Sequence, residues 1–192
     1  MAGQQQPGNR GKGVGIAVGL VLASALLMAH LHKWEEGPKR QLTVYADTLA
    51  NGLPTVCMGL TRHITTTPII LGERWSEEKC DREERAAVLK VQHQLLPCFR
   101  ITPPQSVFDM ATGHAWNQGA GATCGSAAMK AWNRGDWALG CRRIARADSG
   151  HRVWAYTKTG RTLANGRPEM KFVPGLGNRR DDEARICMEN VQ

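Results

Sequence analysis

The sequence lacks the short motifs that would assign a metal or a nucleotide to it. Its six cysteines form no C-x-x-C pair and no cysteine and histidine pattern of a zinc site, and its six histidines share no helical spacing. The glycine-rich run from Gly119 to Gly125 is followed by no G-K-[ST] and preceded by no strand pattern, which argues against a phosphate-binding loop. We therefore expect no metal and no cofactor.

Acidic residues are in deficit. The chain has 25 Lys and Arg against 17 Asp and Glu, a formal net charge of +8, so its surface should attract a polyanion such as nucleic acid, anionic lipid or an acidic cell wall. The basic residues are scattered, and neither a nucleic-acid motif nor an interleaved ladder of aromatic residues accompanies them. We expect no nucleic-acid partner.

The cysteines favour an exported protein. They are even in number and widely spaced, which predicts a disulfide framework, and disulfides persist only in an oxidising compartment. Residues after about 35 are then expected outside the cytoplasm; the alternative is six unrelated buried thiols in a cytosolic protein. The cysteines are Cys57, Cys80, Cys98, Cys124, Cys141 and Cys187.

The N-terminus carries an uncharged apolar segment. Gly13 to Leu31 would span about 28 Å as a helix, close to the thickness of a bilayer core. Arg10 and Lys12 precede it and should hold that end in the cytoplasm. We predict a cytoplasmic tail over residues 1–12 and a signal anchor over residues 13–32, weak because Gly and Ala dilute its larger apolar residues. The alternative is a cleaved signal peptide with Ala23-Ser24-Ala25 as the cleavage site.

Two acidic positions follow this segment. Glu36 lies where a short helix is expected to end, and Asp47 lies in a predicted hairpin with Asn51-Gly52 as its turn. Glycoside hydrolysis needs two carboxyl groups, one protonated and one ionised, on opposite sides of the scissile bond. Glu36 and Asp47 fit these roles, although two solvated surface carboxylates are the alternative from spacing alone.

The motifs around these acids resemble the phage lysozymes, glycoside hydrolase family 24. The similarity runs in order from about residue 34 to 190. It comprises Glu36-Gly37, Tyr45-Ala-Asp47, Thr55-Val-Cys57-Met-Gly59, Thr61, Leu71-Gly72, Trp75 to Cys80, Trp116-Asn117-Gln-Gly119-Ala-Gly121, Ser126 to Trp137, and Gly175-Leu176 through Arg179-Arg180 and Glu183 to Cys187.

The resemblance implies a role for each matched residue. Glu36 would be the general acid, Asp47 the carboxylate that activates water, and Thr55 a residue that positions water or substrate. Asn117 and Gly119 would contact the substrate. The implied reaction is hydrolysis of the β-1,4 bond between N-acetylmuramic acid and N-acetylglucosamine in bacterial peptidoglycan, which causes host lysis.

The hairpin departs from the family pattern. The intervals from Glu36 to Asp47 and from Asp47 to Thr55 are each two residues longer than usual. A tight Asn51-Gly52 turn would pair Thr48 with Thr55 and place Asp47 on the opposite face from Thr55. Either a bulge restores the arrangement or Thr55 is not the equivalent residue.

Two alternatives to this assignment stay open. Glu35 is a rival for the acid role, although Gly37 after Glu36 favours Glu36. A lytic transglycosylase, or a non-catalytic wall binder tethered to the membrane, is the alternative function.

The expected fold class is α+β, mostly α: a lysozyme-like domain over residues 33–192 with a small β-hairpin lobe and a larger helical lobe, preceded by one transmembrane helix. Ser76 should cap a helix that ends before Pro97, and Pro103-Pro104 should open a second. Residues 148–177 are expected to be irregular, either a glycan-binding loop or a surface insertion. Among 15 possible cysteine pairings we favour Cys57 with Cys80 and Cys141 with Cys187, which leaves Cys98 with Cys124.

The segment over residues 13–32 resembles the signal-anchor-release elements of some phage endolysins. It implies a protein held in the host inner membrane with its catalytic domain outside the cytoplasm, then released to the periplasm as a monomer. While the chain is tethered, the helix before Glu36 would be unable to dock. The segment contains no cysteine, so a switch by disulfide exchange with the anchor is not expected.

Overall fold

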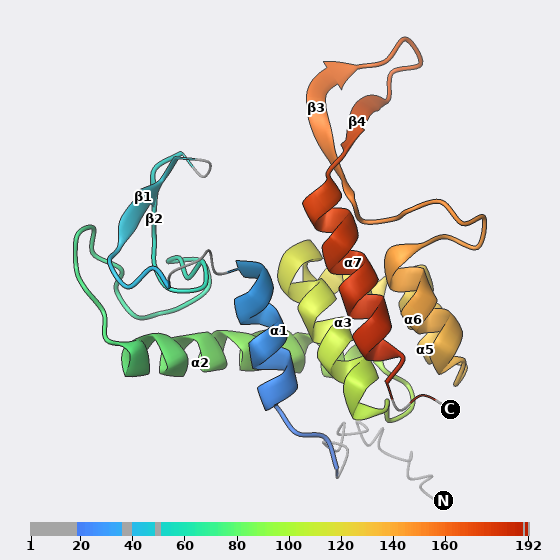
Figure 1. Ribbon diagram of the computed structural model, residues 1–192, viewed down its shortest axis with the longest axis horizontal. Helices are drawn as coiled ribbons and strands as arrows, with labels where there is room; N and C mark the ends of the chain where they lie inside the picture. Colours follow the sequence, from blue (N-terminus) through green and yellow to red (C-terminus); the bar gives the residue numbers. More distant parts are fainter. Residues whose placement is uncertain (1–18, 36–39, 49–50, 190, 192) are drawn as a thin grey trace, which may run out of the picture.

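The computed structural model describes residues 19–35, 40–48, 51–189 and 191. A small β-hairpin lies above one end of the long helix α2, and a group of helices lies at the other end, with α1 between them (Figure 1). The expected α+β, mostly helical architecture is confirmed. The elements are α1 (Ala25–Glu35), β1 (Tyr45–Asp47), β2 (Leu53–Thr55), α2 (Glu77–Leu95), η2 (Leu96–Cys98), α3 (Gln105–Gln118), α4 (Ala120–Cys124), α5 (Ala127–Trp132), α6 (Trp137–Ala145), β3 (Tyr156–Thr162), β4 (Pro168–Phe172) and α7 (Pro174–Cys187).

Local sequence signals set the helix ends. The Ser76 hydroxyl accepts a hydrogen bond from the Lys79 backbone N–H at 3.2 Å and so caps α2, which gives way to the 3₁₀ turn η2 where Pro97 occurs. Ser126 and Asp136 cap α5 and α6 in the same way. The helix predicted after Pro103-Pro104 is α3, and its apolar positions are buried.

Disulfides connect the elements around two apolar clusters. Cys57–Cys80 ties the hairpin lobe to α2, Cys98–Cys124 ties η2 to α4, and Cys141–Cys187 ties α6 to α7. The three predicted pairings are thereby confirmed. The cluster of the helical lobe centres on Trp132, Met110 and Val107, and the cluster below the hairpin contains Val56, Leu60 and Trp75.

The second half of the predicted anchor is docked on the domain. Leu27 and Leu31 of α1 are fully buried and pack with Met58 and Val88. The predicted domain boundary between residues 32 and 33 falls inside α1. No helix among the described residues has the length and apolar character needed to cross a membrane. Residues 1–18, which hold the predicted tail and the start of the anchor, lie outside the described part of the chain.

The segment before α1 is held by side chains of α2 and α3. The Ala23 backbone N–H donates to Gln92 Oε1 at 2.9 Å, and Ser24 Oγ donates to Asp109 Oδ2 at 2.8 Å. Gln105 pairs with both backbone groups of Val21. Gln92 and Asp109 are fully buried, so these bonds satisfy polar groups that would otherwise be costly to enclose.

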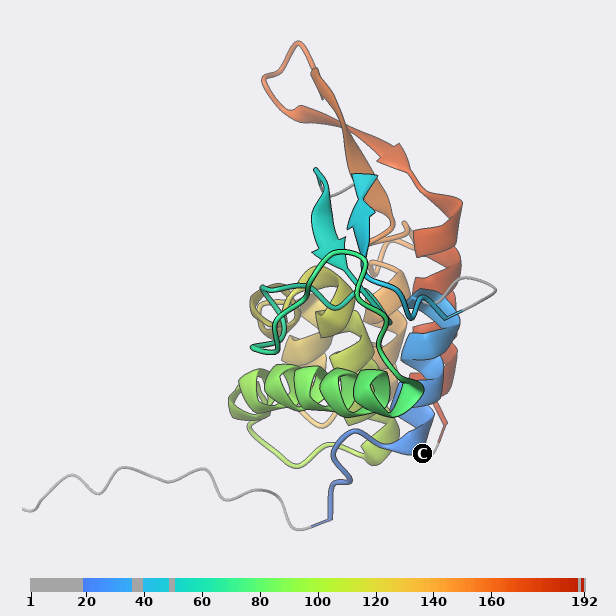
Figure 2. The same cartoon turned by 90° about the vertical axis from the view of Figure 1, so that its left-hand side faces the viewer.

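Residues 148–177 are not the irregular stretch that the sequence predicted. They contain the antiparallel hairpin β3–β4, which projects from the body of the molecule (Figure 2), and the start of α7. The hairpin loop closes with a hydrogen bond from Leu163 N–H to Arg167 O at 2.8 Å, and Gly166 adopts φ +77°. Asn165-Gly166 is a strong hairpin signal that the sequence analysis missed.

Candidate active site

The register of β1 and β2 places two predicted site residues on one face. Tyr45 pairs with Thr55, and Asp47 pairs with Leu53. Because side chains alternate along a strand, Asp47 shares its face with Tyr45 and therefore with Thr55. The predicted pairing of Thr48 with Thr55 is wrong.

The register differs from that of a hairpin with a two-residue Asn51-Gly52 turn. The ladder ends at Asp47 and Leu53, where the Gly52 N–H donates to the Asp47 carbonyl oxygen at 2.7 Å. Asn51 and Gly52 have φ of +54° and +78°, and because Asp47 pairs with Leu53 they are not the two central residues of a two-residue turn. The ladder from Tyr45 to Asp47 has no register shift, so Asp47 and Thr55 share a face without a bulge in the paired residues.

Asp47 and Thr55 differ in exposure. Asp47 is half-buried at the end of β1, whereas Thr55 is 2% exposed. The Thr55 hydroxyl donates to the Leu53 carbonyl oxygen at 3.0 Å, and its oxygen keeps lone pairs that can accept a further hydrogen bond. The pair therefore offers an acidic group and a fixed hydroxyl on the same face.

The predicted acid lies just beyond α1. Glu36 follows the last residue of the helix and is outside the described residues. Its neighbour and rival Glu35 accepts a hydrogen bond on Oε1 from Arg179 Nη1 at 2.5 Å. Because the Arg179 side chain is only 4% exposed, this ion pair joins the end of α1 firmly to α7.

A buried charged network continues from Arg179 along α7. Glu183 Oε1 accepts from Arg179 Nε at 3.2 Å and from Arg180 Nη2 at 2.6 Å, and His30 Nε2 lies 3.6 Å from the same oxygen. A Cβ at Gly113 would lie 3.2 Å from His30 Cδ2, so α3 approaches α1 closely because this position has no side chain. The network fixes α1 against α3 and α7.

Sequence reasoning identified this network only in part. Arg179, Arg180 and Glu183 lie in the closing run that carries the family resemblance, but their role in holding α1 was not predicted. The available signal was an Arg-Arg-x-x-Glu spacing that places the three side chains within one helical turn. His30 carried no signal, since its partners are more than 150 residues away in sequence.

His114 lies beside the network in α3. Burial, followed by the positive charges of Arg180 and Arg179, lowers the pKa of His114 to about 3. Its Nδ1 is 2.8 Å from Thr123 Oγ1, and its ring meets that of Trp154 edge-to-face at 5.0 Å. His114 is therefore a neutral packing residue and not a proton-transfer group at neutral pH.

The two predicted substrate contacts lie at the C-terminal end of α3. Asn117 and Gly119 are exposed, and Gly119 closes the helix with φ +89°. The C-terminal ends of α1 and α3 point to the side from which both hairpins project (Figure 1). The end of α3 that carries these two exposed residues is thus on the same side of the molecule as β1–β2.

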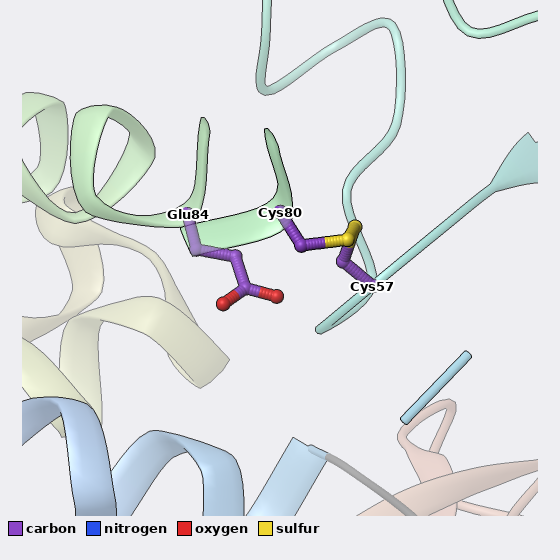
Figure 3. Close-up of side chains that lie close together, drawn as sticks. All are labelled: Cys57, Cys80 and Glu84. Carbon is purple, nitrogen blue, oxygen red and sulfur yellow. A yellow bond between two sulfur atoms is a disulfide. The ribbon is translucent and has the colours of Figure 1, made fainter. Parts of the chain in front are cut away.

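One cluster has the composition of a metal site. Among the described residues, only Cys57, Cys80 and Glu84 bring three potential ligands within 4.8 Å of one another (Figure 3). The two sulfur atoms form a disulfide and provide no thiolate ligands.

Hydrogen bonds within the protein already engage the carboxylate of this cluster. The buried Glu84 accepts from Arg40 Nη2 at 2.6 Å and from the Met58 backbone N–H at 2.9 Å, and it lies 3.1 Å from His32 Nε2. Glu84 thus secures the hairpin lobe to α2.

Solved structures of similar fold include two phage endolysins and a muramidase domain. An endolysin from Escherichia coli O157:H7 phage FAHEc1 has a TM-score of 0.69 at 21% identity, with 89% of this chain and 95% of that chain covered. The muramidase domain of SpmX from Asticaccaulis excentricus gives 0.66 at 17%, with 88% and 98% covered. The active form of P1 phage endolysin Lyz gives 0.63 at 17%, with 90% and 88% covered. At these identities the likeness establishes the fold.

The sequence comparisons give the family. A search of curated proteins found no match. The model of the family described as phage lysozyme matches residues 33–183, which is most of the chain. The chain therefore belongs to the phage lysozyme family.

Proposed function

We propose that this protein is a muramidase that lyses bacterial peptidoglycan by hydrolysing the β-1,4 bond between N-acetylmuramic acid and N-acetylglucosamine. Membership of the phage lysozyme family supports peptidoglycan as the substrate. The observation that carries the residue assignment is the register of β1 and β2, which gives Asp47 and Thr55 a common face. This register removes the conflict that the longer hairpin created.

The proposed mechanism needs two carboxyl groups with different protonation states. Glu36 donates a proton to the glycosidic oxygen as the bond to the anomeric carbon breaks. Asp47 accepts a proton from water as the water oxygen bonds to that carbon, and Thr55 orients the water. One water molecule is added for each bond cleaved. Asn117 and Gly119 position the glycan.

Glu35 supplies the matched control for the acid. We expect Glu36→Gln and Asp47→Asn in the full chain to reduce release of soluble fragments from peptidoglycan by at least a hundredfold, because each removes a group that transfers a proton. Glu35→Gln removes the ion pair with Arg179 and should retain most of the activity at reduced stability. Turbidity loss and mass spectrometry of the released fragments compare the activity of the three variants with that of the parent.

The fragments also separate the competing functions. Reducing ends carrying one added water support the hydrolase. Anhydro ends would make the protein a lytic transglycosylase, and a chain that binds the wall without releasing fragments would be a wall binder. Loss of activity in Glu35→Gln but not in Glu36→Gln would make Glu35 the acid.

We further propose that residues 13–32 first act as a signal anchor in the inner membrane and that release to the periplasm is coupled to docking of α1. The support is mutual exclusion: a segment that buries Leu27 and Leu31 against α2 and bonds Ser24 to Asp109 cannot lie in lipid at the same time. Since Glu36 follows α1 directly, undocking would displace the acid.

Changes ahead of α1 test this coupling. Gly13→Leu with Gly15→Leu raises the hydrophobicity of the anchor without altering any described residue. We expect the full chain to stay in the membrane fraction and lysis to be delayed, whereas Gly13→Ser with Gly15→Ser should leave the membrane sooner. Unchanged fractionation and lysis timing in both variants would contradict release as the control step.

A further inference from the structure

The β3–β4 hairpin with its loop, residues 156–172, forms an arm that adds little to the core. All residues of β3 and all of β4 except Glu169 are exposed. A two-stranded hairpin is marginally stable in water by itself. Residues at its base therefore hold the arm. Val173 N–H donates to Ala155 O at 2.9 Å, the Tyr156 and Phe172 rings lie 5.7 Å apart, and Arg152 lies 5.7 Å from the Phe172 ring.

The arm concentrates positive charge. Lys158, Arg161, Arg167 and Lys171 lie within 14 residues, and none of their side chains forms an ion pair or hydrogen bond with the described residues. The one acid, Glu169, accepts a hydrogen bond from Thr159 Oγ1 at 2.6 Å across the strands. Like charges on one ribbon repel each other, so this arrangement favours an anionic partner that offsets the repulsion.

The position of the charges favours a flexible polymer over a flat membrane. Lys158 faces Met170 across the ladder, and Lys171 faces Thr157, so the two lysines lie on opposite faces of the ribbon. A hairpin that inserts into lipid needs apolar side chains gathered at its tip, but Leu163 is the only large apolar residue of the loop. A flexible polymer can present acidic groups to both faces of the ribbon, whereas a flat membrane can present them to only one.

The arm also lies on the side of the molecule that carries the proposed active site. Both hairpins rise from the same side of the helices, and the arm extends beyond β1–β2 (Figures 1 and 2). We infer that the arm binds the free carboxylates of the short peptides attached to peptidoglycan glycan strands and so holds the enzyme on the insoluble wall. This inference rests on the proposed muramidase function, and it assigns the arm no role in bond cleavage.

Binding measured without cleavage tests the arm separately from catalysis. In the full chain with Glu36→Gln, four changes (Lys158→Gln, Arg161→Gln, Arg167→Gln and Lys171→Gln) define the arm variant. The control variant changes four exposed cations elsewhere, Arg62, Arg82, Lys90 and Arg100, to Gln, so both lose the same net charge. Co-sedimentation with purified sacculi measures affinity at physiological salt.

We expect the arm variant to lose at least tenfold in affinity for sacculi and the control variant to lose less than twofold. Converting the wall carboxyl groups to amides should reduce binding of the parent protein to the level of the arm variant. With Glu36 restored, both variants should cleave peptide-free glycan strands at the parent rate. Equal melting temperatures verify that the arm variant is folded.

Three outcomes would overturn the inference: equal losses in the arm and control variants, binding unaffected by amidation, or arm-dependent binding to phosphatidylglycerol vesicles alone. A parent chain that binds sacculi through the arm but releases no fragments would defeat the muramidase proposal and leave wall binding by the arm intact.

Discussion

His114 shows how a single buried side chain makes stability depend on pH. Its pKa is about 3 in the folded protein and about 6.5 when the chain unfolds, because burial and two nearby arginines disfavour the charged ring. Between these values the unfolded state binds the extra proton. Stability therefore falls as the pH falls below about 6.5, and this loss is complete near pH 3.

We expect His114 to lower the free energy of unfolding by about 1.4 kcal/mol for each unit that the pH falls below 5.5. Urea unfolding of the parent and His114→Gln between pH 6.5 and 4.5 measures it, since only the difference in slope is attributable to this ring. His93→Gln changes an exposed histidine of α2 and should keep the parent slope. Parallel slopes for the parent and His114→Gln would show that His114 is not buried as described.

The site residues were predictable to different degrees. Glu36 and Asp47 were proposed from a short helix end and a hairpin, but their roles came from the family resemblance. The common face of Asp47 and Thr55 could not be deduced, because Asn51-Gly52 allows both a two-residue turn and the last bend of a longer loop. The Arg179 to Glu35 contact depends on tertiary packing, which local sequence does not encode.

At the scale of elements, α1 depends on polar contacts as much as on apolar burial. Ser24 Oγ accepts from the Leu27 backbone N–H at 3.1 Å and donates to the buried Asp109. Burial raises the pKa of Asp109, and the hydrogen bonds from Ser24 and Gln105 oppose that shift. Ser24 is thus both the N-terminal cap of α1 and a partner that makes the buried carboxyl group tolerable.

Ser24→Ala should therefore lower the free energy of unfolding by more than the loss of an ordinary N-terminal cap does. Loss of the cap alone costs about 1 kcal/mol, and the loss of a partner for a buried carboxyl group adds about 1 to 3 kcal/mol. Urea unfolding of the full chain measures the sum, with the exposed Ser149→Ala as the matched control. A loss below about 0.5 kcal/mol would mean that the segment before α1 is not held by α3.

The elements that sequence predicted well have strong local signals. Ser76 and Pro97 bound α2 because a side-chain cap and a proline act within one helical turn. The arm was missed because its strands bury neither face, so they show no alternation of apolar and polar residues. The apolar run before Glu36 has a clear pattern but two possible interpretations, since an anchor and a helix buried in a protein core share the same composition.

At the scale of the molecule, a disulfide and the charged network each hold one of the two elements that flank the proposed site. Cys57–Cys80 secures the hairpin that carries Asp47 to α2, and the α7 network secures the helix that precedes Glu36. These contacts thus fix the hairpin that carries Asp47 and the end of α1, which directly precedes Glu36 in the sequence. The even cysteine count predicted the bridges, whereas the two-lobe arrangement was implied by the resemblance.

The ion pair between Glu35 and Arg179 connects residues 144 positions apart. A ribosome must therefore synthesise almost the whole chain before α7 can reach α1. Nascent chains that stop before α7 lack the partner that fixes the end of α1. The end of α1 is thus fixed against α7 only late in biosynthesis, after Arg179 has been synthesised.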